Sequence, residues 1–136
     1  MKALLLAAAG LALLGCGAVA HTPAGPSSPS VAPGGPTVTD TDENKTLTYH
    51  VGDTFELVLH EQTGWTMWEN VTPSDRTVLQ PMVDTHAAAV RGVTLAKFKA
   101  AATGTSDITA NASMACSPGV ACPALARVWK VTIQVV

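Results

Sequence analysis

Apolar and polar residues alternate with a period of two along most of the chain after residue 45. Successive side chains of a β-strand point to opposite faces, so each alternating run predicts a strand with one buried face and one solvated face. Glycine, proline and aspartate residues separate the runs, as expected for turns. The pattern therefore predicts about seven strands, at residues 46–51, 55–60, 65–68, 78–79, 93–100, 107–114 and 129–135.

Short strands with almost no helical pattern predict an all-β fold, an immunoglobulin-like antiparallel β-sandwich over residues 46–136. The one stretch that could form a helix, at residues 87–90, is too short to change this class. Parity along the third strand puts Trp65 and Trp68 on opposite faces, with Trp68 on the polar one. We therefore expect Trp129 in the core, Trp65 in the core or at a contact surface, and Trp68 as an exposed aromatic anchor.

The N-terminus carries a targeting signal. Lys2 precedes an apolar run at residues 3–14, which would span only about 18 Å as a helix, less than the roughly 30 Å hydrocarbon core of a bilayer. This indicates a signal peptide at residues 1–15. The segment Leu13-Leu14-Gly15-Cys16 resembles the lipobox of bacterial lipoproteins. The resemblance implies a lipidated Cys16 and an exported protein anchored at the outer face of the cytoplasmic membrane or at the outer membrane. The alternative is an ordinary leader that is cleaved near Ala20.

Residues 16–45 are rich in proline, glycine, serine and threonine and show no apolar periodicity. Such a segment buries too little surface to offset the entropy of ordering it, so we expect a disordered linker. Its acidic residues Asp40, Asp42 and Glu43 are expected to form a solvated edge.

The chain has three cysteines, an awkward number for an exported protein. If Cys16 carries lipid, Cys116 and Cys122 remain as a pair whose spacing suits a local disulfide. A metal site is the rival interpretation, but two cysteines without a nearby histidine make a poor ligand set. Because both cysteines flank a single loop, an antibody-type domain, in which the pair joins the two sheets, is excluded.

Charge and motifs exclude several functions. Eight basic and ten acidic residues give a net charge of −2, without the basic stripe that nucleic-acid binding requires. The sequence has no cofactor motif and no arrangement typical of a hydrolase. We expect a monomeric binding protein that is not an enzyme and holds no cofactor or metal.

Several motifs, in order, resemble the chagasin-like inhibitors of papain-type cysteine peptidases. Gly52-Asp53-Thr54-Phe55 and Thr63-Gly64-Trp65 resemble the family's opening strand and first binding loop. Phe98-Lys99-Ala100 with Gly104-Thr105, and the closing stretch at residues 129–135, resemble its later strands. The resemblance covers most of residues 46–136. It implies a non-covalent inhibitor whose loops at one end of the sandwich fill a peptidase cleft, here at Gln62, Thr63, Gly64, Trp65, Gly92, Ser117, Pro118 and Gly119.

The sequence also departs from the family pattern. Glu61-Gln62 replaces an Asn-Pro turn, and Met67 stands where the family has tryptophan. The family's Arg-Pro-Trp loop is absent, because Arg127-Val128-Trp129 opens the last strand instead. The alternative function is therefore a non-inhibitory binding module of the cell envelope that takes a protein or another ligand.

Overall fold

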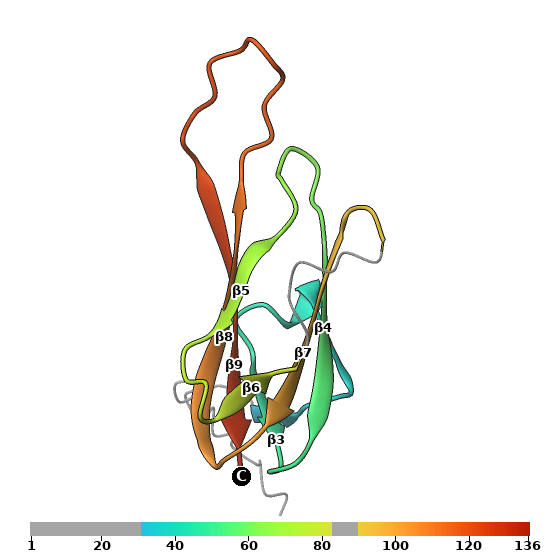
Figure 1. Ribbon diagram of the computed structural model, residues 1–136, viewed down its shortest axis with the longest axis vertical. Helices are drawn as coiled ribbons and strands as arrows, with labels where there is room; N and C mark the ends of the chain where they lie inside the picture. The colour runs from blue at the N-terminus through green and yellow to red at the C-terminus, as the bar shows by residue number, and fades with distance from the viewer. Residues whose placement is uncertain (1–30, 83–89) are drawn as a thin grey trace, which may run out of the picture.

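The structure is a computed structural model that describes residues 31–82 and 90–136. Two β-sheets pack face to face, as Figure 1 shows. One sheet has the order β1 (Val31–Pro33), β3 (Thr46–Tyr49), β9 (Ala126–Val135), β8 (Gly104–Ser113) and β5 (Glu69–Pro73). The other has the order β2 (Thr37–Thr39), β4 (Thr54–His60), β7 (Val93–Ala100) and β6 (Leu79–Pro81). The predicted all-β, immunoglobulin-like sandwich is confirmed.

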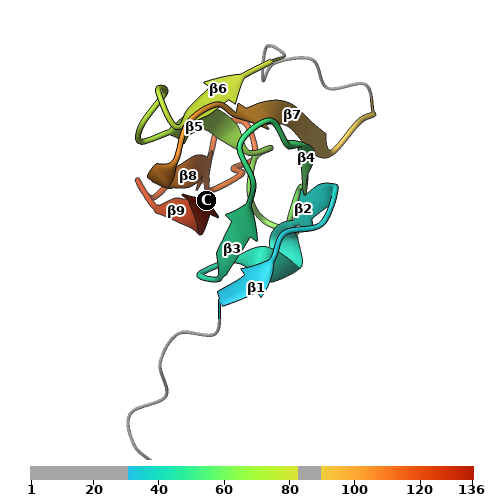
Figure 2. The same ribbon diagram turned by 90° about the horizontal axis from the view of Figure 1, so that it is seen from below.

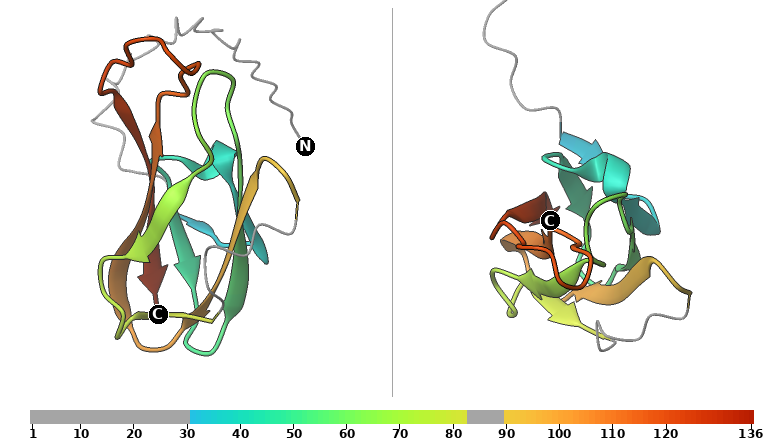
Figure 3. Two further views of the ribbon diagram at one scale, coloured as in Figure 1. Left: turned by 45° about the horizontal axis from the view of Figure 1, so that its top comes forward. Right: turned by 90° about the horizontal axis from the view of Figure 1, so that it is seen from above.

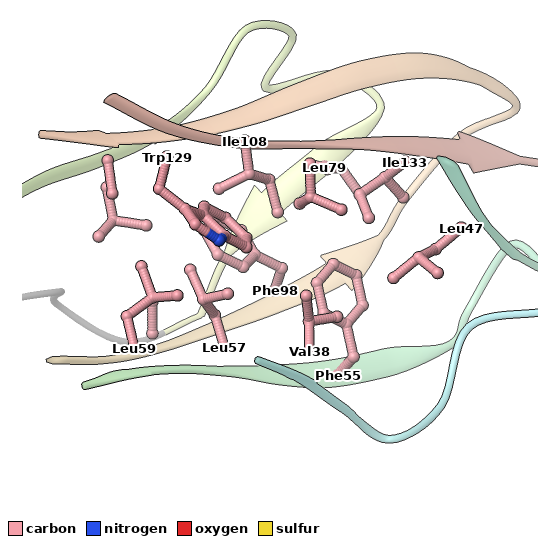
Figure 4. Packing of buried hydrophobic residues seen from close by; sticks show 14 of the residues in the cluster. Val38, Leu47, Phe55, Leu57, Leu59, Leu79, Phe98, Ile108, Trp129 and Ile133 are labelled. Carbon is pink, nitrogen blue, oxygen red and sulfur yellow. The ribbon is translucent and has the colours of Figure 1, made fainter. Parts of the chain in front are cut away.

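The core lies between the two sheets and is built by the alternating residues of the long strands (Figure 4). Phe55 and Phe98 contribute from the four-stranded sheet, with their ring centroids 5.8 Å apart. Trp129 comes from the five-stranded sheet and is 1% exposed, so the predicted core position of this residue is confirmed. Each of these side chains removes a large apolar surface from water, which is the main force holding the sheets together.

The predicted start of the fold at residue 46 is wrong. β1 pairs in parallel with β3, and β2 pairs in parallel with β4, so the segment before residue 46 contributes a strand to each sheet (Figure 2). Val38 is completely buried. The sheets are therefore mixed rather than purely antiparallel, since β3 and β9 also run parallel. The predicted leader, Cys16 and the linker up to residue 30 lie outside the described residues, as does most of the possible helix at 87–90.

The acidic residues before β3 do not form the solvated edge that we expected. A short 3-10 helix, η1 (Asp40–Asp42), turns the chain so that the carboxylates meet donors. Asp42 accepts a hydrogen bond from the Thr39 N–H at 2.9 Å and pairs with Lys45 at 3.1 Å. The Asp40 carboxylate accepts hydrogen bonds from the main-chain N–H of His60.

The expected third strand at residues 65–68 is a loop. Trp65 makes only an isolated bridge to Met114, and β5 begins four positions later at Glu69. Strand parity therefore does not apply, and the expectation of an exposed Trp68 is wrong: its side chain is 3% exposed. The Trp68 Nε1–H donates to the His60 carbonyl at 3.0 Å, which satisfies the indole inside the core. In the described part of the chain, no helix is long and apolar enough to cross a membrane.

Candidate functional site

Three chain segments that are far apart in the sequence meet at one end of the sandwich (Figures 1 and 3). They are the β4–β5 loop (residues 61–68), the end of the β6–β7 connection that leads into β7 (residues 90–92) and the β8–β9 loop (residues 114–125). Loops at the end of a sandwich are free to vary while the sheets hold them in place, so this end is the natural place for a binding site.

The β4–β5 loop has a tight turn at its tip. The Trp65 N–H donates to the Gln62 carbonyl at 2.9 Å, and Gly64 has a φ of 85°, a conformation that favours glycine. Thr63 and Gly64 are exposed, whereas Trp65 is partly buried against the core cluster. Of the two interpretations left open for Trp65, the core contact is observed, with part of the ring still accessible.

Main-chain hydrogen bonds tie the β4–β5 loop to both of its neighbours. The Glu61 N–H donates to the Gly92 carbonyl at 2.7 Å, and the Ala115 N–H donates to the Gly64 carbonyl at 3.0 Å. A hollow of about 440 Å³ lies between the loops. It is lined by His60, Glu61, Gln62, Thr63, Gly64, Trp65, Arg91, Gly92, Val93 and Ala115. Of the residues that the sequence suggested for the binding loops, the structure brings Gln62, Thr63, Gly64, Trp65 and Gly92 together around this hollow.

The β8–β9 loop has a different character. The predicted disulfide between Cys116 and Cys122 is confirmed and closes the loop, with a Cα–Cα distance of 5.7 Å. Residues 114–126 include no charged side chain. Val120 and Leu125 are 65% and 52% exposed. The remaining predicted site residues lie on this exposed tip and do not line the hollow: Ser117, Pro118 and Gly119.

Sequence reasoning missed one residue of this site. Arg127, at the start of β9, donates from Nη1 to the Gln62 Oε1, so a side chain placed outside the loops reaches the central loop. Its guanidinium carbon also lies 5.7 Å from the centre of the Trp68 ring. The sequence signal was an arginine directly after a long uncharged loop, but only the folded chain shows what it contacts.

The arrangement is suited to contact rather than to covalent chemistry. It presents exposed main chain at Gly64, a partly accessible indole at Trp65 and an uncharged cross-linked loop. Within residues 31–82 and 90–136, no group of three or more histidine, cysteine, aspartate or glutamate side chains could hold a metal ion.

Comparisons with known proteins place the fold. No protein-family model matches the sequence, and no curated protein matches it. Among solved structures, the chain is similar to the cysteine protease inhibitor EhICP2 from Entamoeba histolytica, with a TM-score of 0.52 and 17% identity over 79% of this chain and 99% of that one. It also matches amebosin, with a TM-score of 0.41 and 21% identity over 73% of this chain and 95% of that one. The similarity to EhICP2 shows that the chain shares the fold of that cysteine protease inhibitor.

Proposed function

We propose that this domain is a chagasin-like, non-covalent inhibitor of papain-type cysteine peptidases that binds through the three loops at one end of the sandwich. One observation carries the proposal: the β4–β5 loop projects Thr63 and Gly64 while main-chain hydrogen bonds hold it to both neighbouring loops. The fold shared with EhICP2, whose name describes a cysteine protease inhibitor, supports it.

Such inhibition needs no reactive residue in the inhibitor. Loops that are already ordered lose little entropy on binding, so a larger part of the contact energy appears as affinity. An interface of the usual size, on the order of 1,600 Å² in total, would cover the three loops. The uncharged β8–β9 loop, stiffened by its disulfide, would then contribute apolar contact on one side of the central loop.

The departures from the family pattern are compatible with this function. The family's Asn-Pro turn is replaced by Glu61-Gln62, so proline no longer restricts the loop. The hydrogen bond from the Glu61 N–H to Gly92 and the one from Arg127 to Gln62 supply an alternative restraint. We infer that tertiary contacts restrain this loop, whereas in the family the Asn-Pro turn restrains it.

Two matched glycine substitutions test the proposal. Gly64 at the loop tip and Gly52 at the opposite end both have positive φ, 85° and 98°, and an added Cβ would meet nothing within 4 Å at either position. Both G64E and G52E therefore bear the same kind of backbone strain, but only G64E alters the site. The full chain, purified in detergent with its disulfide intact, is titrated against papain while hydrolysis of a fluorogenic peptide is followed.

We expect inhibition at nanomolar to low micromolar concentration, with G64E weakening binding by at least about 2 kcal/mol. G52E should inhibit like the unmodified protein. If the unmodified protein inhibits but both variants are equally impaired, the effect is not specific to the β4–β5 loop, and the proposed binding through that loop is wrong. If the folded, unmodified protein does not inhibit at tens of micromolar, the inhibitor proposal itself is wrong. A non-inhibitory binding module of the cell envelope would then be the better description.

We also propose that the protein is exported and anchored to the bacterial cell envelope through lipid on Cys16. The lipobox-like segment Leu13-Leu14-Gly15-Cys16 supports this, because a thiol next to small residues is what the modification needs. Two or three acyl chains would make the anchoring effectively permanent. Labelling with palmitate and membrane fractionation test it: label and membrane association should both be lost in Cys16→Ser, and their persistence in that variant would contradict the anchor.

A further inference from the structure

We propose that Asp40, Glu43 and Arg127 form a buttress that holds the β4–β5 loop in its binding conformation. The part of this inference that concerns peptidase binding rests on the proposed function. None of the three residues lies in the loops themselves. They are positioning residues that would act on a partner only through the loop that they hold.

The loop needs such support because its local sequence restrains it weakly. Glu61-Gln62 lacks the rigidity of a proline, and Gly64 is free to adopt many backbone conformations. The loop's two ends are joined to each other, since the Trp68 indole donates to the His60 carbonyl at 3.0 Å. That bond fixes the base of the loop but leaves the turn at Gln62 to be held by other contacts.

Arg127 supplies the contact at the turn. Its guanidinium donates to the Gln62 side-chain oxygen and pairs with Glu43 at 3.4 Å on the other side. Both charged side chains are about one-third exposed, at 34% for Arg127 and 30% for Glu43. The guanidinium also lies over Trp68, which limits the positions it can adopt. A planar group held by a carboxylate and an indole is a fixed donor for Gln62.

Asp40 supplies the contact at the base. Its carboxylate lies 2.7 Å from the His60 Nδ1 and accepts the His60 main-chain N–H at 3.1 Å, just before the loop begins. The Asp40 carbonyl in turn accepts the Trp129 Nε1–H at 3.3 Å, which ties η1 to the core. The segment that leads in from the N-terminus therefore supports the loop at two points, at its base through the contact of Asp40 with His60 and at its turn through the contact of Glu43 with Arg127.

The buttress can be tested without any peptidase, by hydrogen exchange of the full chain. Three variants are compared: R127M, which keeps an apolar stem over Trp68 but removes the donor; Q62M, which removes the acceptor; and the double variant. K130M is the matched control, because Lys130 lies on the same strand and forms an exposed pair with Asp107 at 3.5 Å. The reporters are the amide hydrogens of Trp65 and Ala115, which bond within the loop cluster.

We expect R127M and Q62M to exchange about tenfold faster at both reporters, while amides of β8 and β9 stay protected and K130M behaves like the unmodified protein. The double variant should be no faster than R127M, since the two side chains act as one contact. Unchanged loop exchange in a folded R127M, or faster exchange throughout the sheets, would overturn the buttress. Should R127M not fold, the same criteria apply to Q62M alone.

The consequence for recognition is measured separately, by the kinetics of peptidase binding. If only the ordered loop binds, any loss of affinity in R127M should appear in the association rate, in proportion to the fraction of ordered loop that is lost, while dissociation stays nearly unchanged. A change confined to dissociation would mean that Arg127 contacts the partner directly and is not a positioning residue. If the unmodified protein binds no peptidase, the proposed function fails, and the exchange experiment still decides whether the buttress exists.

Discussion

At the scale of single residues, Tyr49 shows how the N-terminal segment is held. It is the only tyrosine of the chain and is 3% exposed. Its ring stacks on Phe55 at 4.4 Å, and its hydroxyl donates to the Gly35 carbonyl at 2.7 Å. Gly34 lies directly against the ring, since a Cβ added there would be 2.1 Å from the Tyr49 Cζ. A glycine at this position is therefore required by the close approach of the main chain to the phenol.

Burial also changes the titration of Tyr49. Burial raises the pKa of Tyr49 from 10.0 to about 12, and the negative charges of the nearby Asp42 and Asp53 carboxylates make a smaller contribution in the same direction. Between these pH values the folded protein keeps the phenol proton that the unfolded chain gives up. The contribution to stability is thus complete below pH 10 and is lost as the pH rises toward 12.

Between pH 10 and pH 12 we therefore expect the free energy of unfolding to fall by about 2 kcal/mol more in the unmodified protein than in Tyr49→Phe. Urea unfolding at a series of pH values measures this difference. The phenolate absorbance, which reports on a single residue here, gives the pKa directly. Parallel stability curves for the two proteins, or an absorbance midpoint near 10, would contradict the prediction.

At the scale of elements, alternation predicted the long strands well and the short ones poorly. The runs at 55–60, 93–100, 107–114 and 129–135 match β4, β7, β8 and β9 closely, because each has one face in the core. β1 and β2 have three residues each, too few to show a period, and they lie among prolines and glycines. Val51 continues the alternation of its run, yet it lies in a turn after β3 and is 51% exposed.

The candidate site was predictable only in part, for a similar reason. The motif Thr63-Gly64-Trp65 located the central loop because it is contiguous in the sequence. The contacts of Arg127 join residues 65 and 84 positions away, to Gln62 and Glu43. No local pattern encodes such contacts, since they exist only once both sheets have formed.

The role of β2 can be tested with one pair of identical substitutions. Val38 is completely buried between the sheets, whereas Val51 is half exposed. Val38→Ala should lower the free energy of unfolding by about 2 kcal/mol, from lost burial and the cavity left behind. Val51→Ala should change it by less than about 0.5 kcal/mol. Chemical denaturation of both variants measures the difference, and a similar small effect at both positions would mean that β2 is not part of the cooperative fold.

At the scale of the whole molecule, the two ends of the sandwich differ in structure. The three loops gather at one end, and the C-terminus lies at the other (Figure 1). The N-terminal segment runs along both sheets through β1 and β2 and then reaches the base of the central loop at His60. A partner that approaches the loops would therefore meet neither the C-terminus nor the turn at Gly52.

Because the loops and the C-terminus lie at opposite ends, we expect a domain added at the C-terminus and an insertion in a loop to affect inhibition differently. A folded domain fused after Val136 should leave the inhibition of papain unchanged within about twofold, because it lies outside the interface. A short flexible insertion between Pro118 and Gly119, in the exposed disulfide loop, should weaken inhibition at least about tenfold while the thermal unfolding midpoint stays the same. Both proteins are titrated with the same fluorogenic assay as the unmodified chain. Equal inhibition by the two would place the contact away from the β8–β9 loop and restrict the site to the other two loops.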